Sequence, residues 1–222
     1  MKKSSLHFLS SLEKNNHKEW FDANKTDYQD AKEDLILTVS DILRQFQQKD
    51  TTLAQVEAQK TLFRINRDVR FSKNKAPYKT NLGASINASG RTGNLAGYYL
   101  HIQPGGNSFC GGGLWNPEPE ALAKVRQEID YNLEEFEAIV ENKDFKKQFG
   151  GLERAEEFLL KREPKGYTKD NPAIEFLKFK CFIGSHHLTD KMVQSEALVS
   201  EILQSFEAIF PLIQFLNRAI LD

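Results

Sequence analysis

Cysteine, net charge and long apolar runs are all scarce in this sequence. Only Cys110 and Cys181 occur, far apart and outside any C-x-x-C spacing, so the sequence supports neither a disulfide framework nor a zinc site. No apolar run approaches membrane-spanning length, and the N-terminal residues are too polar for a signal-peptide core. These absences predict a soluble, cytoplasmic protein that does not engage a membrane.

The familiar catalytic motifs are also missing. The sequence contains no H-E-x-x-H, no G-x-S-x-G, no G-x-x-x-x-G-K-[ST], and no G-x-G-x-x-G between a strand and a helix. These absences weaken the zinc-protease, hydrolase, P-loop and Rossmann interpretations, and no cofactor follows from the sequence. His186 and His187 point to opposite faces of an extended segment, so no metal site is predicted there.

What remains is the composition of an ordinary globular protein. Its 222 residues are 40% hydrophobic and 27% charged, and the formal net charge is −1. The length predicts one domain over residues 1–222. We divide it into N-terminal helices at 5–49, a β-rich centre at 60–115 and a mostly helical part at 116–222.

Helical periodicity marks the N-terminal part. An apolar stripe from Trp20 to Phe46 predicts one long helix, with Asn16 as its cap and Asn24 as a polar interruption. A run of acids falls mostly off this stripe and is expected on a solvated face rather than at a metal. These acids are Asp22, Asp27, Asp30 and Asp34. Near the C-terminus, Pro211 is expected to kink or break a helix.

The centre of the chain changes to a period of two, which is typical of strands. Strands are predicted at 62–65, 82–88, 98–103 and 108–115, joined by turns as an antiparallel β-meander. In the third strand, Tyr99, His101 and Gln103 share one face. With helices before and after, the pattern predicts an α+β fold of about four or more strands packed against several helices.

Three consecutive glycines, from Gly111 to Gly113, lie inside the last predicted strand. Glycine weakens a strand and usually marks a bulge or a close approach by another group. Either an aromatic such as Trp115 or a crossing helix packs there, or a ligand uses the exposed N–H groups. Gly112 is therefore a candidate ligand-binding residue.

The segment from Lys60 to Lys79 is a basic island, with seven basic residues against Asp68 alone. Guanidinium groups bind phosphate or carboxylate in a bidentate fork, and ammonium groups add point charge. The segment therefore predicts an anion site. The candidate ligand-binding residues are Arg67, Arg70, Lys75, Tyr78 and Lys79, and the candidates for proton transfer are His101 and Tyr78.

The run FRINRDVRFSKNKAPYKTNLG, together with GYYLHIQPGG and GGGLWNPEPEAL, resembles the domain-of-unknown-function family 2461. The resemblance covers nearly the whole chain. It implies a single intracellular α+β domain, and it carries no reaction, cofactor or catalytic residue. Asn66 and Asn74 depart from the family pattern, which has an aromatic and an acid at those positions.

Several functional interpretations fit the basic segment. In the first, it lines a groove for a phosphorylated small molecule, a nucleotide or a nucleic-acid segment. An enzymatic version would use the arginines to stabilise developing charge. In the second, it belongs to a non-catalytic interaction module that docks on an acidic protein surface or another subunit. In the third, the basic residues form internal ion pairs that brace the fold.

Overall fold

The structure, a computed structural model, describes all 222 residues and has an α+β fold. The chain divides into two compact units, each assembled from three segments. The first unit comprises Met1–Arg91, Tyr99–Cys110 and His187–Leu203. The second unit comprises Thr92–Tyr98, Gly111–His186 and Gln204–Asp222. Three strands and the last helix contribute residues to both units.

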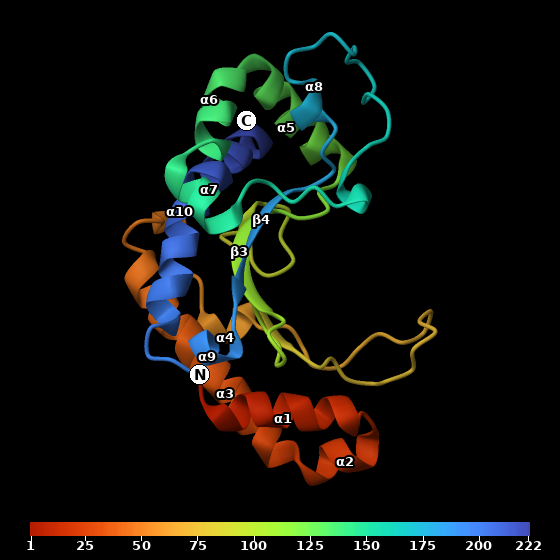
Figure 1. The fold of residues 1–222 in the computed structure, drawn as a ribbon, viewed down its shortest axis with the longest axis vertical. Helices are drawn as coiled ribbons and strands as arrows, with labels where there is room; N and C mark the ends of the chain where they lie inside the picture. Colours follow the sequence, from red (N-terminus) through yellow and green to blue (C-terminus); the bar gives the residue numbers. More distant parts are fainter. The chain divides into compact units, whose positions relative to one another are not determined.

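Ten α-helices and four strands make up the regular structure (Figure 1). The helices are α1 (Lys3–Lys14), α2 (Lys18–Ala23), α3 (Lys25–Phe46), α4 (Ala58–Thr61), α5 (Pro119–Tyr131), α6 (Leu133–Val140), α7 (Lys143–Phe149), α8 (Ile174–Leu177), α9 (Asp190–Val193) and α10 (Leu198–Leu221). The strands are β1 (Leu82–Ile86), β2 (Gly97–Ile102), β3 (Ser108–Leu114) and β4 (Phe182–Leu188). They form one antiparallel sheet in the order β1-β2-β3-β4.

The predicted long N-terminal helix is divided into α2 and α3 at Asn24. The Asn24 side chain donates a 2.8 Å hydrogen bond to the Trp20 carbonyl, so it satisfies a backbone group at the end of α2. The predicted cap is also one residue out of place, because His17 rather than Asn16 accepts from the amide of Trp20. The predicted apolar stripe is confirmed, but it spans two helices.

Asp34 differs from the other acids of the N-terminal helices. It is buried, and its carboxylate accepts from Ser5 Oγ at 2.6 Å and from the amide of Lys2 at 2.8 Å. These bonds tie α3 to the N-terminus of α1, where free amide groups and the helix dipole favour a negative charge. The prediction of a solvated face holds for Asp22, Asp27 and Asp30, which are exposed, and is wrong for Asp34.

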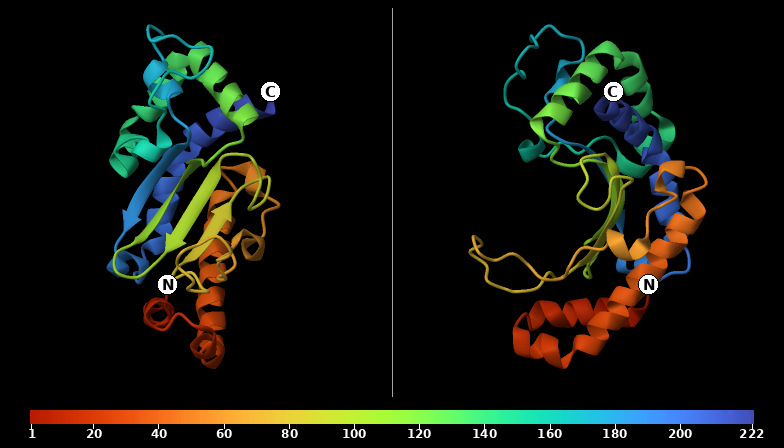
Figure 2. Two further views of the ribbon diagram at one scale, coloured as in Figure 1. Left: turned by 90° about the vertical axis from the view of Figure 1, so that its right-hand side faces the viewer. Right: turned by 180° about the vertical axis from the view of Figure 1, so that it is seen from behind.

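Within the first unit, the sheet has one buried and one half-exposed face. Leu82, Ala84 and Ile86 of β1 are buried, and α3 contacts this strand. On β2, Leu100 is buried whereas His101 is half-buried, as strand alternation requires. Figure 2 shows α3 on one side of β1 and the loop that precedes β1 projecting on the other side. The predicted alternation is confirmed along β2 and for Leu82, Ala84 and Ile86 of β1, but β1 ends at Ile86 and Ala88 is exposed.

The predicted strand at 62–65 is not part of the sheet. Leu62 pairs with Ala84, and Asn66 with Tyr78, only as isolated bridges. Pro77 lies beside this ladder and has no N–H to donate, so a regular strand pair does not extend beyond the bridge. Residues 67–77, which we call the arm, form the loop beyond it. The fourth strand of the sheet is instead β4, predicted only as a short extended segment.

The triple glycine of β3 admits close approach by neighbouring backbone. A Cβ on Gly111 would lie 2.0 Å from the carbonyl oxygen of Gly184, and one on Gly113 would lie 2.0 Å from that of Phe182. Gly113 also has a φ of 118°, which only glycine adopts readily. The group that approaches is therefore strand β4, and Trp115 is 64% exposed.

Helix α10 continues through Pro211, so the expected break does not occur. Pro211 is exposed, whereas Ile209, Leu212 and Ile213 around it are buried and hold the helix in place. α10 is long and apolar enough to cross a membrane by length and composition. Core helices of soluble proteins pass the same test, so this one helix is weak support for a membrane span.

Candidate functional site

Two cations of the arm bind the arm's own backbone. The Arg67 guanidinium donates to the Ala76 carbonyl at 2.9 Å and to Ser72 Oγ at 3.4 Å. Lys75 Nζ donates to the Val69 carbonyl at 2.9 Å. These bonds cross the arm and hold its two sides together, so Arg67 and Lys75 have a bracing role in addition to their charge.

Arg70 forms a surface ion pair. Its guanidinium donates to both carboxylate oxygens of Asp68, with distances of 3.0 Å and 2.6 Å for the two shortest bonds. Hydrogen bonds from Arg70 lower the pKa of Asp68, and the same contact raises the pKa of Arg70. Because both groups are exposed, this pair is screened by water and salt.

Tyr78 lies at the base of the arm and packs into the first unit. Its ring stacks on Phe21 with 4.0 Å between centroids, and the residue is buried. The backbone of Tyr78 makes two hydrogen bonds with the Asn16 side chain, at 3.0 Å and 2.9 Å. Tyr78 therefore anchors the arm to the turn between α1 and α2.

Lys79 belongs to a group of cations around one aromatic ring. Lys79 Nζ lies 5.2 Å from the centroid of Phe63, and the Arg91 guanidinium carbon lies 5.6 Å from the same centroid. Burial, followed by the charges of Arg64 and Arg91, lowers the pKa of Lys79. We call Phe63, Arg64, Lys79 and Arg91 the Phe63 cluster.

No carboxylate forms an ion pair with a cation of the Phe63 cluster. Arg91 donates instead to the backbone carbonyl of Leu62. Arg64 is exposed, and its charge helps to lower the pKa of Asp68, which Arg70 already binds. Like charges repel one another. The two cation–π contacts with Phe63 are each worth about 0.5–1 kcal/mol at a partly exposed site, and they help to hold the cations together.

A polar network on the open face of β2 has His101 at its centre. His101 Nε2 lies 2.9 Å from Gln103 Oε1, and Nδ1 lies 2.9 Å from the Asn81 amide nitrogen and 3.2 Å from the Tyr99 hydroxyl. The ring stacks on Phe109. Burial lowers the pKa of His101, so the imidazole is neutral at neutral pH. Nε2 donates to Gln103, and Nδ1 accepts from its two partners.

The Phe63 cluster and the His101 network share one surface of the first unit. The rings of Phe63 and Tyr99 pack in a T-shaped arrangement, with 6.2 Å between ring centroids, and the Tyr99 hydroxyl lies 3.2 Å from His101 Nδ1. Gly83 leaves space for this hydroxyl, because a Cβ there would lie 2.9 Å from it. Cations, aromatic rings and neutral hydrogen-bonding groups therefore lie side by side.

The predicted ligand-binding residues take different places. Lys79 joins the Phe63 cluster, whereas Arg67, Arg70 and Lys75 belong to the arm and Tyr78 packs against Phe21. The sixth, Gly112, lies in the second unit against the Gly97 carbonyl and Ile213. Sequence reasoning missed Phe63 and Arg91, because no local pattern connects two residues 28 positions apart.

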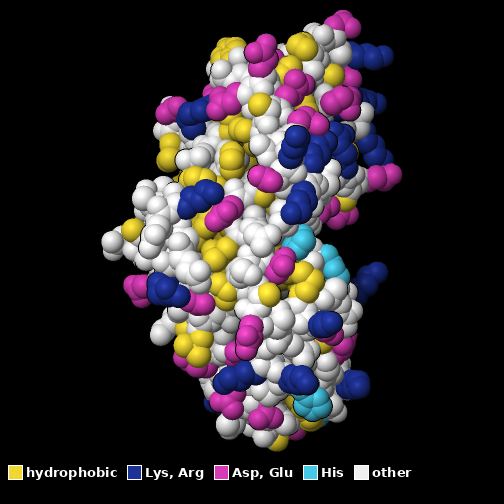
Figure 3. Space-filling view, turned by 60° about the vertical axis from the view of Figure 1, so that its left-hand side comes forward, with side chains coloured by type: hydrophobic (Ala, Val, Ile, Leu, Met, Phe, Trp, Pro, Cys, Tyr) yellow, Lys and Arg dark blue, Asp and Glu magenta, His cyan; other side chains and the backbone are white.

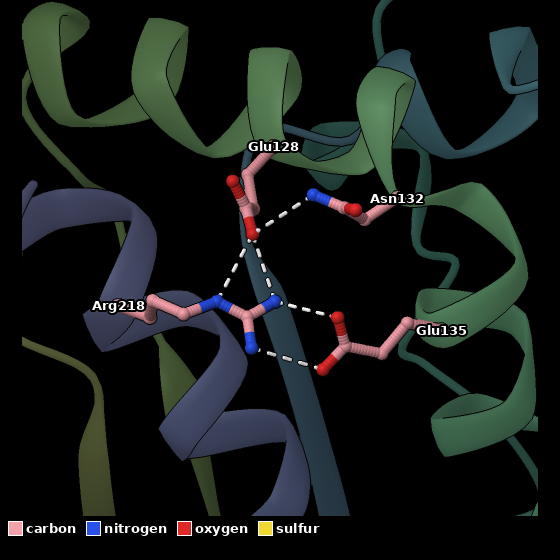
Figure 4. Close-up of polar contacts among 4 residues, drawn as sticks. All are labelled: Glu128, Asn132, Glu135 and Arg218. Atoms are coloured by element: carbon pink, nitrogen blue, oxygen red, sulfur yellow. Dashed lines mark hydrogen bonds and ion pairs between the residues drawn. The ribbon is translucent and has the colours of Figure 1, made fainter.

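The second unit contains a cation that, unlike those of the Phe63 cluster, is paired with carboxylates (Figure 4). The Arg218 guanidinium donates to Glu128 at 2.8 Å and 3.0 Å, and to Glu135 at 2.6 Å and 3.0 Å. Hydrogen bonds to the two carboxylates raise the pKa of Arg218, and Arg218 in turn lowers the pKa of Glu135. This network joins α10 to α5 and α6.

Other Lys and Arg side chains also lie at the surface. On the face seen in Figure 3, Lys and Arg side chains are interspersed with Asp and Glu. No three His, Cys, Asp or Glu residues come together as a metal-binding group. A pocket of about 240 Å³ in the second unit has Val140, Phe149 and Phe176 in its lining, and an ion pair of 2.9 Å joins two further lining residues, Lys146 and Glu141.

Comparison with known proteins identifies a family across almost the entire chain. The family described as "Conserved hypothetical protein (DUF2461)" matches residues 4–215. No curated protein and no solved structure matches the chain.

Proposed function

We propose that this chain, which belongs to the DUF2461 family of conserved hypothetical proteins, binds a phosphorylated ligand of the nucleotide class at the Phe63 cluster. The observation that carries the proposal is the gathering of Lys79, Arg64 and Arg91 without a paired carboxylate. Their mutual repulsion opposes folding. A bound phosphate would remove this repulsion, and the electrostatic free energy so gained would contribute to binding.

The neighbouring groups favour a ligand that has a polar or aromatic part as well as a phosphate. Lys79 and Arg91 supply an ammonium and a guanidinium for phosphate oxygens. Tyr99 lies next to Phe63 and adds a second aromatic ring. Asn81 and Gln103 bring amide groups that can hydrogen-bond a base or sugar. A nucleotide combines all of these partners in one small molecule.

We assign binding rather than a reaction to this surface. Both ring nitrogens of His101 are engaged, Nε2 by Gln103 and Nδ1 by Asn81 and Tyr99. Burial also raises the pKa of Tyr99, so its hydroxyl keeps its proton. In the proposed function, His101 positions the amides around it.

Calorimetric titration with AMP, ATP and inorganic phosphate tests the proposal. Lys79→Met keeps the aliphatic stem and removes the charge, and should weaken binding about tenfold, or about 1.4 kcal/mol. Arg91→Gln should have a similar effect. Arg70→Gln is the matched control, because it removes a charge that Asp68 already pairs. If no anion binds, or if Lys79→Met binds as well as the parent protein, the proposal is wrong.

A further inference from the structure

Near its middle, which we call its tip, the arm carries a large aromatic side chain without a packing partner in the core. Phe71 is 96% exposed, and the guanidinium carbon of its neighbour Arg70 lies 5.9 Å from the ring centroid. Lys73 and Lys75 of the arm are exposed as well. Figures 1 and 2 show the arm as a long loop that projects from its unit.

The charge around Phe71 limits what can cover it. From Arg64 to Lys79 there are six basic residues and one acid, Asp68, which gives 6 − 1 = +5 in a chain whose net charge is −1. Arg67 and Lys75 use some N–H groups within the arm, but hydrogen bonds to backbone carbonyls leave their positive charge in place. A partner of the arm must therefore be anionic and must offer a flat surface to Phe71.

We propose that the arm and the Phe63 cluster together bind single-stranded nucleic acid. This inference rests on the proposed function and extends its ligand from a nucleotide to a polymer. An unpaired base stacks on Phe71, and the phosphates on either side lie along the cations between Phe71 and Phe63. Exposed aromatic rings interleaved with cations are how proteins bind single strands without reading sequence.

The length of the arm explains why a polymer is required. Phe63 and Phe71 are eight positions apart in the sequence, so at about 3.3 Å per residue their Cα atoms are at most about 26 Å apart. The backbone pairing below the arm keeps the Phe63 end extended. A mononucleotide cannot reach from the Phe63 cluster to an extended tip, whereas a strand of several nucleotides can follow the arm and contact both.

Two features favour a single strand over a membrane or a duplex. Membrane association of a basic surface element relies on an extended apolar face, and at this tip Phe71 is the one exposed large hydrophobic side chain. In a duplex the bases are stacked inside, so Phe71 would meet a base only if the helix were opened. A single strand presents both its bases and its phosphates at no such cost.

Fluorescence anisotropy with a labelled single strand of about 12 nucleotides, and calorimetry with AMP, provide the test. Phe71→Ala should weaken binding of the strand about 5-fold to 150-fold, the range of one base–aromatic stack, and should leave AMP binding unchanged. Phe71→Trp should retain strand binding. Lys79→Met should weaken both. Because Phe71 is exposed, its substitution should leave the melting temperature unchanged, which serves as the folding control.

The outcomes separate this inference from the proposed function. If AMP binds and the strand binds no better, or if Phe71→Ala binds the strand normally, the nucleic-acid inference is wrong and the nucleotide site stands. If neither ligand binds, both proposals fail. Binding of phosphatidylserine vesicles, or of an acidic peptide, that depends on Phe71 while the strand does not bind would also overturn the inference.

Lys73→Ala should reduce the slope of the logarithm of the strand's binding constant against the logarithm of salt concentration by about 0.7, because one phosphate contact is lost.

Discussion

Arg218 in the second unit and Arg91 in the first unit lie over aromatic rings in nearly the same way. The Arg218 guanidinium carbon is 5.0 Å from the Phe215 centroid, and that of Arg91 is 5.6 Å from the Phe63 centroid. The difference lies in the other neighbours. Arg218 meets two carboxylates, which raise its pKa, whereas Arg91 is near other cations and helps to lower the pKa of Lys79.

A contact with an aromatic ring therefore positions a cation, but it does not determine whether the cation pairs with a carboxylate or remains available to a ligand. The charge of Arg218 is satisfied by Glu128 and Glu135, and it joins helices. The charges of Lys79 and Arg91 remain available to a ligand under the proposed function. Whether a basic residue is available to a ligand therefore depends on the acids that the fold places beside it.

The largest expected effect comes from giving the Phe63 cluster a carboxylate. Lys79→Glu would place an acid beside Arg64 and Arg91, so the cations of the cluster would be paired with a carboxylate, as Arg218 is. Anion affinity should fall about a hundredfold, or about 2.8 kcal/mol, in calorimetry. The melting temperature should not fall, because repulsion is replaced by attraction.

Lys73→Glu is the matched control for this change, since it makes the same charge reversal at an exposed arm position outside the cluster. It should leave AMP affinity within a few-fold of the parent value. Equal losses from both substitutions would mean that only the total charge of the segment matters.

The second effect is a smaller decrease in the free energy of unfolding. Arg218→Met keeps the stem over Phe215 but removes the pairing of two carboxylates. The side chain is 44% exposed, so solvent screening limits the loss in unfolding free energy to about 1 kcal/mol. For a chain of this length, that loss corresponds to a fall of about 2–4 °C in melting temperature. Anion binding should be unchanged, and a parallel loss of binding would contradict the comparison.

The third effect is a loss of stability at acid pH, which the Arg218 network should show and the Phe63 cluster, which contains no carboxylate, should not. Arg218 lowers the pKa of Glu135 in the folded protein. The Glu135 carboxylate therefore contributes stability that is fully present above the unfolded pKa of a Glu, about 4.3. This stability is lost as the pH falls through the folded pKa of Glu135. Thermal melts below pH 5 should therefore lose stability more steeply in the parent protein than in Arg218→Met. Equal slopes would show that the pairing is not maintained in solution.

The smallest effect is expected at the exposed pair of the arm. Arg70→Gln removes the partner of Asp68, but both groups are in water, and exposed pairs of this kind often contribute nothing measurable. Its melting temperature and its affinity for AMP should match those of the parent protein. A clear loss in either would place Arg70 with the Phe63 cluster and would weaken the distinction between paired and available cations.

The α+β class, the alternation in β1 and β2, the basic island and the family could all be predicted from the sequence. Each is carried by residues close together in the chain, where side-chain periodicity determines which face is buried. Boundaries and caps were less well predicted. Asn24 divides a stripe that reads as continuous, because its side chain satisfies the backbone of the preceding helix.

What only the tertiary structure decided is which distant residues meet. Phe63 and Arg91 come together because Leu62 bridges to Ala84 of β1 and the Leu62 carbonyl accepts from the Arg91 guanidinium. Asp34 is buried because α1 begins beside α3. Periodicity carries no information about such partners. The sequence by itself determined where the positive charge lies. Only the tertiary structure decided which cations acquired a carboxylate and which did not, because that depends on distances between side chains far apart in the chain.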